Sequence, residues 1–162
     1  MKILGVDPGI ARTGWGVIEY QKSKIKNQKY GCIETSSKHN PSERLKQIYN
    51  ALTEIIKEHK PDALAVEELF FNTNVKTAFV VGQARGVVLL AAAEKNVSVS
   101  IYTPLQVKVA VTGYGRAEKS QIGQMVKVLL KLREIPKPDD VSDALAVALT
   151  HAFSKNFKQA TH

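Results

Sequence analysis

Residues 2–9 read KILGVDPG, an apolar run that ends in Asp7-Pro8-Gly9. This pattern predicts a buried strand followed by a tight turn, because Asp, Pro and Gly are the residues that turns favour. Two more strand-like runs follow over 13–20 and 24–35, and the turn between them carries Lys22, Lys24 and Lys26. Strands joined by short connections pair antiparallel, so these three runs predict a meander.

The pattern changes after Asn40, where apolar residues recur at helical spacing. Asn40, Pro41 and Glu43 form a helix-start signal, and Pro61 closes the helix. The remaining predictions are a strand over 63–69, helices over 74–95, 103–113, 122–130 and 140–153, and a strand over 97–102. This order predicts a single α/β domain over residues 1–162. Its five-stranded mixed sheet would combine the three-strand antiparallel meander with parallel strands, with helices on both faces.

The predicted helix over 74–95 is apolar almost all round, and Gly82, Ala84 and Gly86 allow close approach. A helix with so little polar surface is expected to be covered by the core on one side and by a second subunit on the other.

The composition favours a polyanionic partner. The net charge is +8, which promotes binding to nucleic acid through neutralisation of phosphates. The single cysteine, Cys32, provides no disulfide framework and no thiolate metal site. The longest unbroken apolar run, residues 87–93, is shorter than the roughly 20 residues that cross a bilayer. No signal-peptide pattern is recognised, so a cytoplasmic protein without membrane contact is expected.

Acidic residues follow two predicted strands and open the last helix. Asp7 ends the first strand, while Glu67 and Glu68 end the strand over 63–69. Each of these could be an ordinary turn or strand-end charge. Asp140 and Asp143 are harder to explain, because two carboxylates on one face of a helix beside an apolar stretch repel each other. A bound cation or a raised pKa relieves that cost.

These acids come together if the strands ending in Asp7 and Glu67 are parallel neighbours, since both then reach the same edge of the sheet. Oxygen ligands without thiolates select Mg²⁺ or Mn²⁺. Two such ions catalyse in-line displacement at phosphorus. The residues therefore predict a metal-dependent phosphodiesterase, and they leave open the choice of Glu67 or Glu68 and of Asp139 or Asp140.

The whole chain resembles the RuvC family of Holliday junction resolvases, in the ribonuclease H-like superfamily. The matching stretches, in order, are ILGVDPG (3–9), TGWGV (13–17), AVE (65–67), GQARG (82–86), AEKSQ (117–121) and DVSDALA (140–146). The resemblance implies a homodimeric, Mg²⁺-dependent endonuclease, with Mn²⁺ as a substitute. Such an enzyme nicks two strands of a four-way junction symmetrically in recombination and DNA repair, and leaves 5′-phosphate and 3′-hydroxyl ends. It also implies the RuvA–RuvB branch-migration complex as a partner.

The resemblance carries residue roles onto matching positions. The catalytic and metal-binding acids are Asp7, Glu67, Asp140 and Asp143, and the residues expected to contact DNA are Lys108, Lys119, Phe70 and Arg116. A base contact by Phe71 in place of Phe70, and a role for Arg85 at DNA or at a dimer interface, stay open.

Three other functions are weighed against this one. Actin-like ATPases and sugar kinases begin with a similar strand and hairpin, but they need a second related domain, for which 162 residues leave no room. A ribonuclease H that cuts RNA–DNA hybrids would use similar acids. A non-catalytic DNA-binding module explains the basic charge, but it does not require Asp140 beside Asp143.

Overall fold

One mixed sheet organises the molecule. The computed structural model describes residues 1–22, 24–68 and 74–159. The five strands are β1 (Lys2–Asp7), β2 (Arg12–Gln21), β3 (Lys24–Glu34), β4 (Ala63–Glu67) and β5 (Ser98–Tyr102), in the spatial order β3-β2-β1-β4-β5. Strands β1, β2 and β3 pair antiparallel, whereas β4 is parallel to both β1 and β5. The predicted meander and mixed sheet are confirmed.

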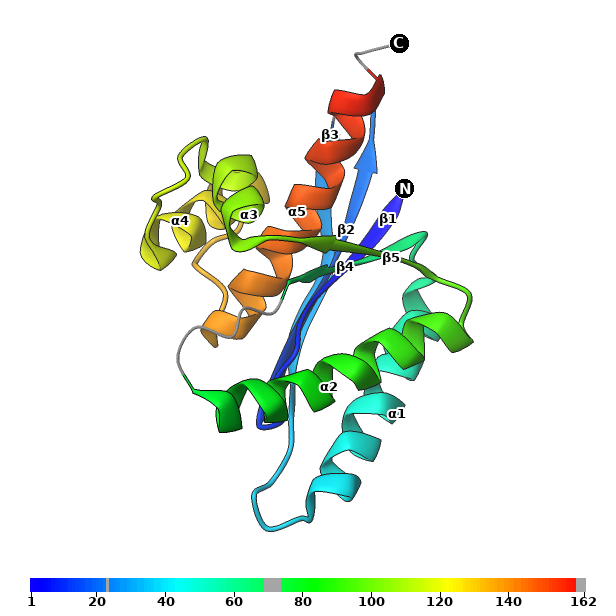
Figure 1. The fold of residues 1–162 in the computed structure, drawn as a ribbon. Coiled ribbons are helices and arrows are strands. Elements are labelled where there is room, and N and C mark those ends of the chain that lie inside the picture. Colours follow the sequence, from blue (N-terminus) through cyan, green and yellow to red (C-terminus); the bar gives the residue numbers. More distant parts are fainter. Residues whose placement is uncertain (23, 69–73, 160–162) are drawn as a thin grey trace.

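Alternating side chains along the strands build a core on each face of the sheet. Leu4 and Val6 of β1, with Leu64 and Val66 of β4, face α1 (Pro41–His59) and α2 (Val75–Glu94). Ile3 and Ala65 point the other way, toward α3 (Pro104–Thr112), α4 (Lys119–Leu129) and α5 (Asp139–Gln159). Helices therefore lie on both faces, as predicted (Figure 1).

Local signals set the helix ends. Asn40 accepts a hydrogen bond from the amide of Glu43 at 2.9 Å, in the capping box expected for α1. Thr103 and Gln106 form the same arrangement at the start of α3, and Gly113 ends that helix in the left-handed conformation. The predicted bounds differ from the observed ones by a few residues. The largest differences are in α5, which begins at Asp139 and continues to Gln159.

Helix α5 lies directly on the sheet because two glycines allow it. A methyl group at Gly5 of β1 would collide with the carbonyl oxygen of Ala144, and one at Gly14 of β2 would collide with the carbonyl oxygen of Asp140. Substitutions that need this space force the helix outward. The two glycines therefore place the first turns of α5 at the end of β1 that carries Asp7.

Helix α2 leaves an apolar side uncovered. Ala84, Val88, Ala91 and Ala92 are buried against the sheet and α1, but Phe79 is 66% exposed and Leu90 is 52% exposed. By length and composition alone, α2 is also apolar enough to cross a membrane, and it is the one such helix in the described part of the chain. Its buried face belongs to the core, whereas its outer face is an exposed apolar surface.

Candidate active site

The four predicted acids come from three elements that meet at one end of the sheet. Asp7 is the last residue of β1 and Glu67 the last of β4, and these parallel strands pair Val6 with Val66. Asp140 and Asp143 lie in the first turns of α5, whose backbone at Asp140 contacts Gly14 opposite Asp7. The condition for a shared cluster, parallel neighbouring strands, is thus met.

Among the four acids, Asp7 has the most strongly shifted pKa. Burial and the negative charges of Asp143, Asp140 and Glu67 raise its pKa to about 8, and the nearby Lys119 opposes that change only in part. A carboxyl group with such a pKa is costly to ionise without a compensating cation. Groups perturbed by both burial and specific charges are concentrated at functional sites.

Asp143 is held by a direct ion pair. The ammonium of Lys119, the first residue of α4, lies 2.9 Å from a carboxylate oxygen of Asp143. Burial raises the pKa of Asp143, and the hydrogen bond from Lys119 opposes that rise. Burial likewise raises the pKa of Glu67, with a further contribution from the charge of Asp143. The sequence analysis predicted that Lys119 contacts DNA but missed this pairing, because no local signal connects α4 with α5.

The structure also distinguishes adjacent acids. Glu67 is half-buried and borders a small cavity together with Asp143 and Lys108. Glu68 is exposed, and its amide donates a hydrogen bond to the carbonyl of Tyr102 at 2.7 Å. On α5, Asp139 is exposed, whereas Asp140 is half-buried and raises the pKa of Asp7.

The residues predicted to contact DNA lie at different distances from the acids, and Phe70 is not among the described residues. Lys108 lies beside the cluster, where its charge lowers the pKa of Glu67 against the effect of burial. Arg116 is exposed in the connection between α3 and α4, and within the described ranges no ion pair joins it to an acid. Phe70 and Phe71 lie outside the residues that the structure describes. Arg85 lies on α2, and its buried Nε atom has no hydrogen-bond partner among the described residues.

The four carboxylates suit a hard divalent cation, although their side chains do not yet lie close enough together to bind one. In the described ranges, no group of three acidic, histidine or cysteine side chains stands close enough together to hold a metal ion. Asp140 and Asp143 each raise the pKa of Asp7, and the carboxylate of Asp143 pairs with Lys119. Carboxylate oxygens alone suit Mg²⁺ or Mn²⁺, and a cation would offset both repulsion and burial.

The elevated pKa of Asp7 predicts a pH-dependent stability. An acid whose pKa is higher in the folded than in the unfolded chain binds more protons when folded. The contribution of Asp7 to stability therefore falls as pH rises from about 4 to about 8. Without divalent cations, Asp7→Asn should melt higher than wild type at pH 9, by about 2–4 °C for each kcal/mol gained. Thermal melting at pH 5 and pH 9 measures this, with Asp139→Asn as control. An equal or lower melting temperature for Asp7→Asn at pH 9 would contradict the effect.

Comparison with known proteins identifies the family. A family model described as crossover junction endodeoxyribonuclease RuvC matches residues 3–151. A protein of that name from Alkaliphilus metalliredigens is 59% identical, over 98% of this chain and 96% of its own length. The structure of Thermus thermophilus RuvC in complex with Holliday junction substrate is 40% identical, with a TM-score of 0.92 over 98% of this chain and 96% of that one.

The more distant yeast mitochondrial Holliday junction resolvase Ydc2 shows likeness of fold alone, with 14% identity and a TM-score of 0.63 over 99% of this chain and 86% of that one. The Thermus thermophilus match confirms the ribonuclease H-like fold that the resemblance implied. The chain belongs to the crossover junction endodeoxyribonuclease RuvC family.

Proposed function

We propose that this chain is a Mg²⁺-dependent endonuclease that resolves four-way DNA junctions by paired, symmetric nicks during recombination and repair. The observation that carries the proposal is the meeting of Asp7, Glu67, Asp140 and Asp143 at the end of one sheet, with the pKa of Asp7 raised to about 8. Such a cluster is poorly explained as structural, because it stores repulsion that only a cation or protons relieve.

The four acids would hold the metal, and Mn²⁺ could substitute for Mg²⁺. Two bound ions would supply an activated water and stabilise the leaving oxygen. Asp7 would bind metal from the end of β1, and Glu67, Asp140 and Asp143 would complete the site from β4 and α5. Hydrolysis that expels the 3′ oxygen leaves a 5′-phosphate and a 3′-hydroxyl, the pair of ends that ligase joins.

Two lysines beside the acids would position the scissile phosphate. Lys119 already touches Asp143 at 2.9 Å, and Lys108 borders the same cavity as Glu67 and Asp143. Arg116 would contact the DNA backbone from the exposed α3–α4 connection, and Phe70 would stack on bases of the junction. The net charge of +8 supports a long contact with phosphates.

Lys119→Ala should slow cleavage about 100-fold, the cost typical of removing one preorganised charge donor. Lys119 lowers the pKa of Asp143 against the effect of burial, so its loss should also shift the acidic limb of the pH–rate profile to higher pH. Junction cleavage measured across pH tests both effects. Lys127→Ala, on the same helix, is the matched control and should behave as wild type. An unshifted profile would mean that Lys119 does not tune Asp143.

A homodimer is the proposed working form, because two symmetric nicks need two active sites. The exposed apolar face of α2, with Val75, Phe79 and Leu90 between 52% and 82% exposed, is the surface that a second copy would cover. A dimer interface on α2 would also explain why so apolar a helix lies on the surface of a protein with a net charge of +8. We further propose a single nuclease domain that acts in the cytoplasm with the RuvA–RuvB complex.

Substrate choice separates this function from its rivals. The purified chain should be incubated with Mg²⁺ and three end-labelled substrates: a four-way junction, a linear duplex of the same sequence and an RNA–DNA hybrid. Cutting of the junction alone is the expected result. Cutting of the hybrid would favour a ribonuclease H, whereas binding to the junction without any cutting would favour a non-catalytic module.

A further inference from the structure

Tyr102 lies directly opposite the proposed metal ligand Glu67 in the sheet. The two residues are partners in the parallel pairing of β4 with β5, and Tyr102 is the last residue of β5. The amide of Glu68 donates a hydrogen bond to the carbonyl oxygen of Tyr102 at 2.7 Å. The chain that leaves Glu67 is therefore attached to the backbone of Tyr102.

The side chain of Tyr102 is attached to α5, the helix that carries Asp140 and Asp143. Its hydroxyl lies 2.8 Å from Nδ1 of His151 and 3.0 Å from the hydroxyl of Ser154. The rings of Tyr102 and His151 meet edge to face, with centroids 6.0 Å apart and planes inclined by 75°. His151 is buried, so this contact lies inside the packed interface between helix and strand. Tyr102 thus joins β5 to the helix that supplies two of the four acids.

One arrangement of protons satisfies all three polar contacts of this network. The hydroxyl of Ser154 donates its single proton to the carbonyl oxygen of His151 at 2.9 Å. The hydroxyl of Tyr102 then donates to Ser154, and Nδ1 of His151 donates to the hydroxyl oxygen of Tyr102. Each donor is used once, so removal of the Tyr102 hydroxyl breaks two of the three bonds.

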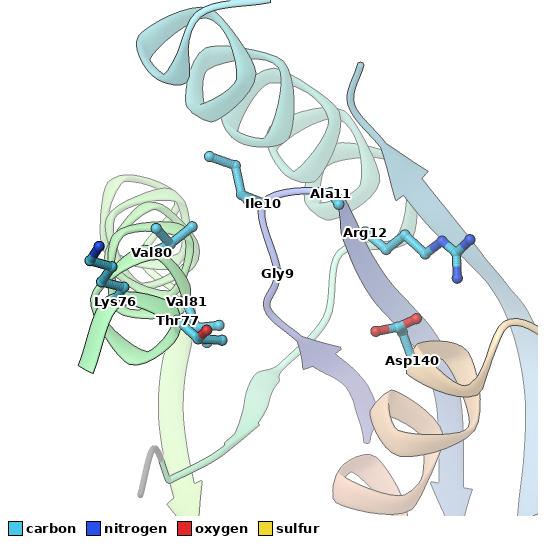
Figure 2. Close-up of a pocket in the computed structure, with 9 residues that line it drawn as sticks. All are labelled: Gly9, Ile10, Ala11, Arg12, Lys76, Thr77, Val80, Val81 and Asp140. Atoms are coloured by element: carbon cyan, nitrogen blue, oxygen red, sulfur yellow. The ribbon is translucent and has the colours of Figure 1, made fainter. Parts of the chain in front are cut away.

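On the opposite side of the sheet, α5 is placed by backbone contact instead. Gly5 of β1 leaves room for the backbone of the helix at Ala144. Gly14 of β2 does the same at Asp140, whose carboxylate lies beside the turn between β1 and β2 (Figure 2). Strands β4 and β5 contain no glycine, and there the Tyr102 side chain makes the connection.

We propose that the hydroxyl of Tyr102 is a positioning group that sets the separation between Glu67 on β4 and Asp143 on α5, and with it the affinity of the acidic cluster for Mg²⁺. The inference rests on the proposed function, because it takes the cluster to be a metal site. Mg²⁺ requires oxygen ligands at about 2.0–2.1 Å in nearly octahedral geometry, so a small displacement of one carboxylate weakens binding. Groups that orient metal ligands typically contribute about 10- to 100-fold to affinity.

Tyr102→Phe tests the proposal, because it keeps the ring and removes only the hydroxyl. In single-turnover cleavage of a four-way junction, the half-saturating Mg²⁺ concentration should rise at least about fivefold. The rate at saturating Mg²⁺ should stay within about threefold of wild type. Loss of stability alone would lower the rate at saturating Mg²⁺ as well. An unchanged half-saturating concentration, whatever the maximal rate, would overturn the proposal.

Hydrogen exchange provides a second readout that needs neither metal nor DNA. In Tyr102→Phe the amide of Glu68 should exchange at least about tenfold faster than in wild type, because its acceptor is no longer held against α5. The amide of Asp62, bonded to the carbonyl oxygen of Lys2 at 2.9 Å just before β4, should exchange as in wild type. Equal exchange of the Glu68 amide in the two proteins would overturn the proposal.

The matched control is Tyr49→Phe. It also removes a phenolic hydroxyl, one that donates to the carboxylate of Glu94 on the other face of the sheet. This variant should match wild type in both measurements, and an equal change in it would count against a specific role for Tyr102. If wild-type protein cuts no junction at any Mg²⁺ concentration, the proposed function fails instead, and the exchange of the Glu68 amide still reports on the connection.

Discussion

Asp143→Asn should abolish junction cleavage, with a rate at least about 1,000-fold below wild type, and leave junction binding intact. The substitution keeps the shape of the side chain but removes the charge that pairs with Lys119 at 2.9 Å and that would bind metal beside Glu67. Losses of this size are typical when one member of a catalytic set that acts as a unit is removed. Single-turnover cleavage and a junction-binding titration measure the two properties separately.

The matched control for this substitution is Asp139→Asn, four residues away on the same helix and exposed. It removes the same charge from the same helix start, so it reports any general electrostatic effect on DNA. We expect less than a fivefold change in its cleavage rate. If Asp143→Asn lost junction binding or melted far below wild type, the acid would hold the fold rather than catalyse.

Phe79→Asp should convert the proposed dimer to monomers and uncouple the two nicks. Phe79 is 66% exposed, and Gly86, two turns further along α2, has no neighbour within 4 Å of the position where its Cβ would be, so a second helix can approach closely. A carboxylate placed in an apolar contact costs several kcal/mol to desolvate. Analytical ultracentrifugation should show the monomer, and paired nicks per binding event should fall at least about tenfold.

Val128→Asp is the control for surface charge, because Val128 on α4 is 63% exposed but lies away from α2. That variant should remain a dimer and cut both strands. A wild-type chain that sediments as a monomer while still making paired nicks would contradict the proposed interface.

The fold was predictable because its signals are local. Asp7-Pro8-Gly9 marks the turn that starts the meander, and the capping residues Asn40 and Thr103 mark helix starts that the structure confirms. Predicted ends are off by a residue or more where no strong signal exists. The last helix extends past Phe153, for example, since nothing between there and Gln159 stops a helix.

The site was predictable only in part, because its geometry depends on contacts between distant segments. The residues alone left Glu67 and Glu68 open, and the choice of Glu67 came from the family resemblance; the structure shows Glu67 half-buried and Glu68 exposed. The pairing of Lys119 with Asp143 joins residues on two helices whose relation follows from packing around α5. The pocket between the Gly9–Arg12 turn and the first turns of α2 likewise joins segments more than 60 residues apart in the chain.

The products of one cleavage reaction test the central claim most directly. A four-way junction with a label on each strand in turn should be incubated with the chain and Mg²⁺, and the products then treated with DNA ligase. We predict nicks at symmetric positions in two opposing strands, each with a 5′-phosphate and a 3′-hydroxyl, so that ligase seals both into intact duplexes. Nicks that ligase cannot seal, nicks without symmetry, or cutting that persists in Asp7→Asn would contradict the account.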